Sequence, residues 1–412
     1  MPQITPFQAI RPNKEVAARI AALPYDVYNR KEATEIVLKE PLSFLKIDRA
    51  ETSFPETVDT YDDQVYQRAK ELLHEMVQNG SFITENNACY YIYELTMNYH
   101  IQTGIVACSS VTDYQNGLIK KHENTRPEKE LDRIRHIDIT EAHTGPIFLA
   151  YPAHAGIHEI VTTAKESDAE YDFISDDGIR HRVWVIDEEK TIDALQKAFT
   201  DIPATYIADG HHRCASAVKV ALKRQAENPN HSGDEEYNRF LSVLFSDDQL
   251  KILPYNRVVS DLNGLSREEL IEKIKKQGFE VEYMGTKVVA PEQKGCFGMY
   301  LADGWYRLTA KNKLLSAHPV KGLDVAILQD YLLGPVLGID DPRIDKRIEF
   351  IGGIRGLDEL EKRVATDMMA AFSMFATKTS ELLKVADAGL LMPPKSTWFE
   401  PKLRSGLFIH TI

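Results

Sequence analysis

The stretch Tyr206–Val218, "YIADGHHRCASAV", joins an apolar segment to an amphipathic one through the five residues DGHHR. The segment that leads into it, "ATYIAD" at 204–209, is apolar with β-branched and aromatic members, which predicts a buried strand. After Arg213, apolar residues recur at 214, 217, 218, 221 and 222, which is the spacing of a helix packed on a sheet. DGHHR is therefore expected where a strand ends and a helix begins.

The residues at this junction favour binding of an anion. Backbone N–H groups at a helix start are unpaired, and the helix dipole adds partial positive charge. Gly210 lets the backbone approach a ligand closely, and Arg213 offers a planar fork that suits phosphate oxygens. His211 and His212 can donate hydrogen bonds or carry charge near pH 7. These features predict a phosphate-binding turn.

Two alternatives for the same junction remain open. In the first, Asp209 caps the helix and the histidines are structural. In the second, Asp209 and the histidines bind a metal ion, although their spacing matches no standard zinc motif.

A second segment rich in charged residues spans 117–136, "GLIKKHENTRPEKELDRIRH". The first residues complete a strand. Thr125 followed by Glu128 has the pattern of a capping box, and Pro127 suits a first helical turn. From Glu128 onward we expect a solvated, salt-bridged helix.

The loop before that helix carries the candidate catalytic residues His122 and Glu123. A carboxylate at this place can accept a proton from a hydroxyl group or hold Mg²⁺. Thr125 and Arg126 belong to the same loop and are candidate phosphate-binding residues. Arg126 can neutralise phosphate charge together with the lysines at 120 and 121.

Two further stretches are weaker candidates. The segment 390–407, "LLMPPKSTWFEPKLRSGL", contains Lys395, Ser396 and Thr397, but Pro393 and Pro394 lack the N–H donors that a P-loop needs. These three residues are expected either to form a wall of the site or to belong to an apolar tail on the core. Asp26, in "ALPYDVYNR", is expected to be structural.

Composition limits the function classes. The chain has 412 residues, is 43% hydrophobic and carries a formal net charge of −13. Such an acidic chain disfavours nucleic acid as a partner, whereas a small anion needs only a local positive pocket. Its four cysteines are far apart and form no CxxC pair, so neither a disulfide framework nor a structural zinc site is indicated. With no long apolar run and no apolar leader, we expect a cytoplasmic protein without a membrane partner.

Short strands alternate with helices along the chain, which predicts a mixed α/β fold. A strand hairpin is expected at 89–97 and 100–111 and a second one at 295–310. Single strands are expected at 240–246 and 249–259, and 224–238 is expected to be a flexible polar stretch. Helices are expected at 31–40, 60–80, 188–201, 266–284, 356–375 and 377–389. The expected division is an N-terminal α+β segment (1–105), a nucleotide-binding catalytic domain (106–255) and a C-terminal α+β segment (256–412) that could complete the site.

These motifs resemble known families. The strand–DGHHR–helix pattern resembles the signature turn of the ParB/sulfiredoxin-like fold, where a GxxR core at a helix N-terminus binds nucleotide phosphates. Together with the upstream His-Glu loop, it is similar to free-serine kinases of the SerK type. Over nearly its full length the chain also resembles a bacterial and archaeal family catalogued as a conserved domain of unknown function. The motifs that carry this resemblance are "PYDV", "HENT", "ADGHHR", "ILPYNRVV" and "MPPKSTWFEPK".

The resemblance implies roles for the site residues. Gly210, His211, His212 and Arg213 would hold the nucleotide phosphates, and Asp209 would bind Mg²⁺ or orient a histidine. Glu123, with His122 beside it, would take the proton of the acceptor hydroxyl. The implied reaction transfers a phosphoryl group from ATP or ADP to the hydroxyl of free serine. The acceptor pocket is not assigned, and the oligomeric state stays open, with a homodimer as one option.

Other functions remain as alternatives. A nucleotide-switched binding protein without turnover would need the same phosphate turn but no base, and a hydrolase could use the two histidines and a metal. Sulfiredoxin chemistry is disfavoured because His211 stands where that reaction needs a cysteine. ParB-type DNA partitioning is disfavoured because the chain has neither a helix-turn-helix pattern nor a basic balance of charge.

Overall fold

A computed structural model describes residues 1–412, and its internal contacts group the chain into two compact units. The first unit comprises 1–250 and 401–412, and the second comprises 251–400. The mixed α/β class predicted from the sequence is confirmed. The division into three segments stays a prediction; strand β5 (His100–Ser110) runs across position 105.

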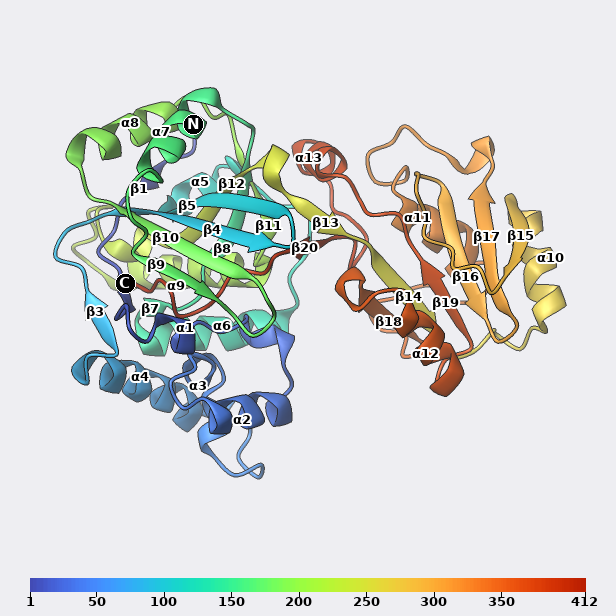
Figure 1. Ribbon diagram of the computed structural model, residues 1–412, viewed down its shortest axis with the longest axis horizontal. Coiled ribbons are helices and arrows are strands. Elements are labelled where there is room, and N and C mark those ends of the chain that lie inside the picture. Colours follow the sequence, from blue (N-terminus) through green and yellow to red (C-terminus); the bar gives the residue numbers. More distant parts are fainter. The chain divides into compact units, whose positions relative to one another are not determined.

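A nine-stranded mixed sheet forms the centre of the first unit (Figure 1). Its order is β6-β11-β8-β12-β5-β4-β10-β9, with β1 paired to β5. The predicted hairpin is confirmed: β4 and β5 pair from Met97↔His100 onward, and Asn98 adopts φ 56° in the turn. The strands not yet delimited are β1 (Ile4–Thr5), β4 (Tyr90–Met97), β6 (Ile119–Lys120), β8 (Ile147–Tyr151), β9 (Tyr171–Ile174), β10 (Arg180–Ile186), β11 (Thr205–Asp209) and β12 (Arg239–Ser246).

Helices cover this sheet. They are α1 (Ala17–Ile20), α2 (Arg30–Lys39), α3 (Leu45–Asp48), α4 (Asp63–Gln78), α5 (Val111–Gln115), α6 (Pro127–Thr140), α7 (Ala155–Ala164), α8 (Glu189–Phe199) and α9 (His211–Glu227). One core cluster joins the apolar side chains of α7, α8 and α9 to those of β4, β5, β8 and β12. A second cluster lies among α2, α3 and α4, which gather on the side of the sheet opposite α7 and α8 (Figure 1).

The second unit is built on a six-stranded antiparallel sheet of order β15-β17-β16-β19-β14-β18. A separate two-stranded pair consists of β13 and β20. Its elements are β13 (Lys251–Leu253), β14 (Tyr255–Val259), α10 (Arg267–Gln277), β15 (Phe279–Gly285), β16 (Cys296–Leu301), β17 (Gly304–Ala310), α11 (Asp324–Leu328), the π-helix η6 (Gln329–Leu333), β18 (Ile348–Gly352), α12 (Asp358–Thr366), β19 (Ala370–Ser373), α13 (Thr379–Asp387) and β20 (Trp398–Glu400).

Several expected elements are corrected by the structure. The helix expected at 266–284 ends at Gln277, because Gly278 takes φ +122° and the chain continues as β15. The helix expected at 356–375 ends at Thr366, and "AAFS" forms β19 between β14 and β16 instead. The strand expected at 249–259 is two strands, β13 and β14, separated by Pro254. The stretch expected to be flexible from 224 onward is helical up to Glu227.

The C-terminal segment 401–412 is fixed within the first unit by contacts along its length. Ser405 exchanges two backbone hydrogen bonds with Ala22, and Ile409 does the same with Ile10. The strand β21 (His410–Thr411) pairs with β7 (Ala142–His143), and β2 (Ile10–Pro12) pairs with β3 (Phe82–Thr84) nearby. The buried Arg404 donates to the Asp177 carboxylate at 2.6 Å. This segment is therefore part of the first unit's core.

A glycine in this segment tests how tightly it packs. Gly406 has φ +83°, and a Cβ built there would lie 2.5 Å from the Phe44 side chain. Gly178 has a similar φ of +77° but open space around it. We expect Gly178→Ala to cost about 1 kcal/mol of unfolding free energy, and Gly406→Ala to cost about 1–3 kcal/mol more, because it adds overpacking to the same backbone strain. Urea unfolding followed by circular dichroism measures both, and equal midpoints for the two variants would contradict the tight packing.

Candidate functional site

The two sequence motifs meet because the strands that precede them are parallel neighbours. β6 pairs with β11 through Thr205↔Ile119 and Tyr206↔Lys120. Parallel strands leave a sheet at the same edge, so the residues that follow each strand lie close together. His122 follows the end of β6 by two residues, and His211 follows the end of β11 by two residues. The predicted phosphate turn and the predicted His-Glu loop therefore share one edge of the sheet.

The predicted strand–turn–helix junction is confirmed. β11 ends at Asp209 after a register shift, and α9 begins at His211. Gly210 is the N-cap, with φ +92° and no side-chain cap, so the alternative in which Asp209 caps the helix is wrong. A Cβ at Gly210 would lie 3.3 Å from Nε of Arg213, which shows that the guanidinium folds back over the turn. Glycine is thus favoured here both by backbone conformation and by the approach of Arg213.

Asp209 has a partner that the sequence did not suggest. Its Oδ2 accepts a hydrogen bond from Lys402 Nζ at 2.7 Å, and its Oδ1 accepts from the Gly210 N–H at 2.8 Å. Although burial favours the neutral acid, Lys402 and Arg213 lower the pKa of Asp209, so the carboxylate is ionised. The C-terminal segment thereby places a lysine at the predicted phosphate turn. No pattern near either residue indicates this contact, because 193 positions separate them.

Two histidines face each other beside the turn. The His122 and His211 rings meet edge to face with centroids 4.5 Å apart. Both are buried, at 1% and 7% exposure, and Nε2 of each ring lacks a hydrogen-bond partner. Burial lowers the pKa of His122 to about 4 and the pKa of His211 well below its usual value, so both rings are neutral near pH 7. Glu123 is half-buried next to them, and its carboxylate and the two rings each place one ligand atom within 4.8 Å of the others.

The other two residues of the loop are held by different contacts from those predicted. Thr125 does not form the capping box with Glu128: the helix starts one residue later, and the Thr125 hydroxyl donates to Glu130 at 2.6 Å. The exposed Arg126 is the N-cap, and its backbone N–H donates to Nε2 of His212 at 2.9 Å. This bond joins the His-Glu loop directly to the predicted phosphate turn.

The helix α6 is not the solvated element that we expected. Glu130, Asp132, Arg133 and His136 are all buried. The reason is the packing of α6 between α4 and α9: Tyr66 of α4 donates to Asp132 at 2.9 Å, and bonds to α9 hold the opposite side.

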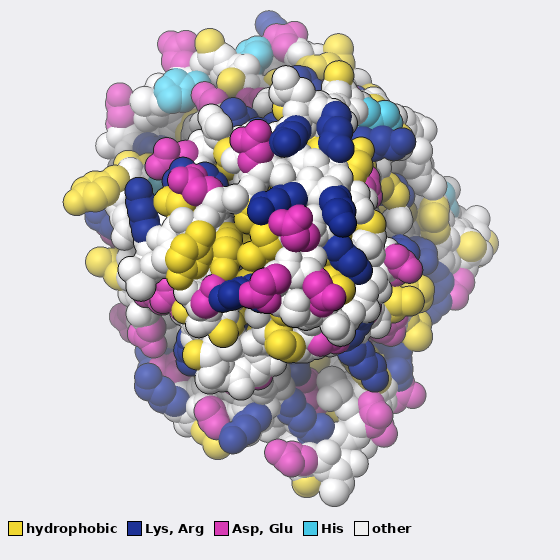
Figure 2. Space-filling model, turned by 90° about the vertical axis from the view of Figure 1, so that its right-hand side faces the viewer, with side chains coloured by type: hydrophobic (Ala, Val, Ile, Leu, Met, Phe, Trp, Pro, Cys, Tyr) yellow, Lys and Arg dark blue, Asp and Glu magenta, His cyan; other side chains and the backbone are white.

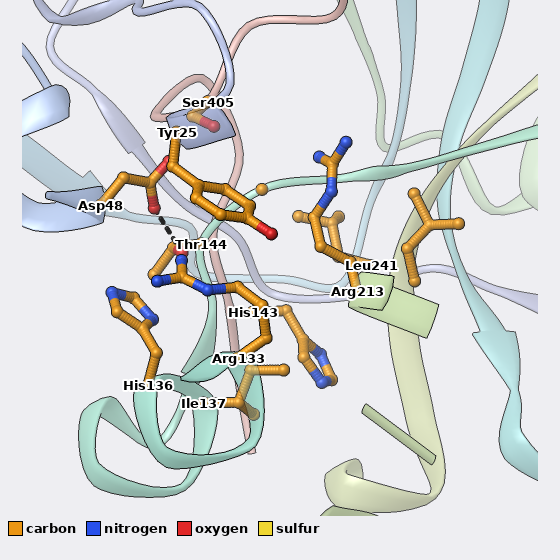
Figure 3. A pocket seen from close by; sticks show the side chains of 12 residues that line it. Tyr25, Asp48, Arg133, His136, Ile137, His143, Thr144, Arg213, Leu241 and Ser405 are labelled. Carbon is orange, nitrogen blue, oxygen red and sulfur yellow. Dashed lines mark hydrogen bonds between the residues drawn. The ribbon is translucent and has the colours of Figure 1, made fainter. Parts of the chain in front are cut away.

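A pocket opens beside Arg213, and α6 supplies part of its wall (Figure 3). The Arg133 guanidinium lies 3.9 Å from the Tyr25 ring centroid, and Asp48 accepts a hydrogen bond from Thr144 at 2.9 Å. Arg213 Nη1 donates to the Pro146 carbonyl at 2.6 Å. Sequence analysis missed this pocket; in the "PYDV" motif it considered Asp26, whereas Tyr25 is the residue that lines the pocket. Its lining residues are Tyr25, Asp48, Arg133, His136, Ile137, His143, Thr144, Gly145, Ile147, Arg213, Leu241 and Ser405.

Lys395, Ser396 and Thr397 lie in the second unit. The Lys395 carbonyl accepts from Arg257 at 3.1 Å, and the Ser396 hydroxyl donates to the Pro393 carbonyl at 2.6 Å. Their predicted role as a wall of the site stays a prediction.

On the face shown in Figure 2, basic and acidic side chains are interspersed.

Comparison with known proteins identifies the family. A family model described as a protein of unknown function (DUF1015) matches residues 4–326, so the chain belongs to that family, and the membership predicted from the motifs is confirmed. No curated protein matches the chain. Among its helices, none combines the length and the apolar character that a membrane crossing requires.

Distant structural matches were also found. A free serine kinase in complex with AMP aligns at 16% identity and a TM-score of 0.37, covering 74% of this chain and 91% of that chain. The truncated SbnI protein of Staphylococcus aureus aligns at 12% identity and a TM-score of 0.40, covering 74% and 87%. A conserved hypothetical protein from Pyrococcus furiosus aligns at 14% identity and a TM-score of 0.35, covering 74% and 94%.

The Mg²⁺ ion implied by the resemblance does not fit the residue assigned to it. Mg²⁺ is held in proteins by carboxylate oxygens, waters and substrate phosphates. Both Asp209 oxygens accept hydrogen bonds, and one of the donors is the Lys402 ammonium. The remaining cluster, His122, Glu123 and His211, offers two nitrogens and one carboxylate. Such nitrogen donors suit transition metals better than Mg²⁺.

The pocket histidine His136 predicts a pH dependence of stability. Burial lowers its pKa to about 4, whereas an unfolded chain has a histidine pKa near 6.5. Between these values the unfolded state binds the extra proton, so the unfolding free energy falls as the pH drops from about 6.5 to about 4, by up to about 3 kcal/mol for this residue. His136→Gln should flatten that fall, whereas the exposed His158→Gln should not. Urea unfolding at several pH values tests this, and equal slopes for both variants would refute it.

Proposed function

We propose that this protein is a small-molecule kinase that transfers a phosphoryl group from ATP or ADP to the hydroxyl of free serine. The phosphates of the donor would bind at Gly210–Arg213. Glu123 would take the proton of the acceptor hydroxyl as its oxygen attacks the terminal phosphorus. The new O–P bond would replace the bond to the leaving phosphate, which departs as ADP or AMP.

One observation carries this proposal: the phosphate turn and the His-Glu loop are joined to each other. The Arg126 N–H donates to His212, and the His122 ring contacts the His211 ring. A protein that only bound a nucleotide would need the turn, but it would have no use for a half-buried carboxylate next to it. Phosphoryl transfer needs both groups in one place, because catalysis here consists mainly of positioning and charge stabilisation.

The pocket beside Arg213 supports an amino acid as the acceptor. Arg133, whose guanidinium also pairs with Asp132 at 2.9 Å, and Asp48 place opposite charges on its wall, and a free amino acid carries a carboxylate and an ammonium group. Burial raises the pKa of Tyr25 to about 12, so its phenol stays protonated and can donate a hydrogen bond. We propose serine as the amino acid because the sequence motifs resemble those of free-serine kinases.

Glu123→Gln tests the assignment of the base. The amide keeps the size of the side chain but cannot accept the hydroxyl proton, so we expect turnover to fall by about 10²–10⁴-fold while nucleotide affinity is retained. The assay incubates the protein with ATP or ADP, Mg²⁺ and each free amino acid, and detects phosphorylated products by mass spectrometry.

Glu128→Gln is the matched control, because it makes the same substitution and removes the same charge at an exposed position in the first turn of α6. Full activity of Glu123→Gln would refute the base assignment. Tight nucleotide binding without a product from any acceptor would favour the nucleotide-switched binding protein instead.

Arg213→Met tests the phosphate turn. The substitution keeps an unbranched apolar stem and removes the guanidinium that folds over Gly210. Because charged hydrogen bonds to phosphate contribute about 1.5–3 kcal/mol each, we expect nucleotide affinity to fall at least tenfold in calorimetry. Lys197→Met, an exposed change of the same charge on α8, should leave the affinity unchanged. Equal affinities of the two variants would remove Arg213 from the phosphate site.

A further inference from the structure

We infer that His122, Glu123 and His211 form a binding site for a divalent transition-metal ion at the edge of the sheet where β6 and β11 end. The two histidine rings and the carboxylate each offer one ligand atom, and these atoms all lie within 4.8 Å of one another. Bonds of about 2.0–2.2 Å to a common ion place ligand atoms up to about 4 Å apart, so a contraction of about 1 Å would close the set.

The histidines support this site independently of their spacing. Two buried imidazoles face each other, and their Nε2 atoms lack hydrogen-bond partners. Buried polar atoms nearly always have a partner, because leaving one unpaired costs about 1–3 kcal/mol. An ion bound by one nitrogen of each ring would supply a missing interaction for both.

The chemistry of the donors selects the class of ion. Two imidazole nitrogens and one carboxylate oxygen are typical ligands of Zn²⁺, Fe²⁺, Co²⁺ and related ions, with remaining positions open to water or substrate. Mg²⁺ prefers oxygen ligands throughout. The sequence did not indicate this set, because it does not show which of the adjacent histidines at 211 and 212 lies near the His-Glu loop side chains. In the structure the His211 ring contacts the His122 ring, whereas His212 accepts a hydrogen bond from the Arg126 N–H.

The role of the ion rests on the proposed function. A carboxylate that binds a metal through one oxygen keeps the other for a proton, so Glu123 could both hold the ion and accept the hydroxyl proton. Coordination positions that the three side chains do not fill could bind a phosphate oxygen or the acceptor hydroxyl. Binding of the ion itself does not depend on that reaction.

Cobalt provides a direct probe of the site. The full-length protein, freed of metal with a chelator, is titrated with Co²⁺ while visible absorption is recorded, and bound metal is counted by mass spectrometry after desalting. We expect one Co²⁺ per chain, visible bands typical of nitrogen and oxygen ligands, and a higher midpoint of thermal unfolding. Zn²⁺ should displace Co²⁺, whereas a large excess of Mg²⁺ should not.

Variants decide whether these three residues hold the ion. His122→Gln and His211→Gln should each weaken Co²⁺ binding at least tenfold and abolish the thermal shift, and the exposed His158→Gln should match the wild type. Circular dichroism shows whether a variant is folded; if either histidine variant is not, Glu123→Gln gives the same test from the half-buried ligand. Unchanged Co²⁺ binding in the folded ligand variants, or no stoichiometric binding by the wild type, would overturn the inference.

The same experiment separates this inference from the proposed kinase activity. Phosphorylated serine formed by a protein that binds no Co²⁺ at these residues would refute the metal site and leave the kinase intact. Co²⁺ bound by the three residues, without phosphoryl transfer to any acceptor, would support the metal site and refute the kinase.

Discussion

The parallel pairing of β6 with β11 is the constraint on which the site depends. Only two residue pairs form this ladder, yet they make both strands leave the sheet at one edge. The chain between the strands runs from 121 to 204, through α6, β7, β8, α7, β9, β10 and α8. A parallel pair requires such a crossover, and this one brings His122 against His211 across 89 positions. Without this pairing, the phosphate turn and the His-Glu loop would be two unrelated loops.

The helices that follow these strands hold the arrangement in place. Ser216 of α9 donates to the Glu130 carbonyl of α6 at 3.0 Å, and Lys219 pairs with the Glu130 carboxylate. Farther along, Lys223 donates to Asp138 at 2.6 Å, and Arg224 donates to the carbonyl of Ile412 at 3.0 Å. The last contact ties α9 to the C-terminal segment that also carries Lys402. The two helices, the turn and the C-terminus thus form one continuous hydrogen-bonded assembly.

Sequence patterns predict those parts of this site that are formed by residues close together in the chain. The strand, the turn and the amphipathic stripe of α9 follow from residue spacing alone, and Glu123 was identified by its place before a helix. Lys402 is the last residue of the quoted motif "MPPKSTWFEPK", but its contact with Asp209 was missed because nothing in that motif refers to a residue 193 positions away. Arg133 was missed because α6 has a polar sequence, although two neighbouring helices bury it. β19 was taken for helix because "AAFS" lies at the end of a helical pattern, and only its neighbours β14 and β16 make it a central strand.

Because the His122 and His211 rings are neutral, the positive charge near the turn comes from other groups. The sequence suggests that they carry charge for a phosphate, but burial lowers the pKa of both His122 and His211, so neither contributes positive charge near pH 7. Lys402 is paired with Asp209, so an anion at the turn would be attracted mainly by Arg213, by Lys121, whose charge acts on His211, and by the N-terminus of α9. Glu123 opposes that attraction. The divalent ion proposed for His122, Glu123 and His211 would reverse the local balance of charge, and neutral imidazoles and a carboxylate would then be compatible with the proposed phosphate site.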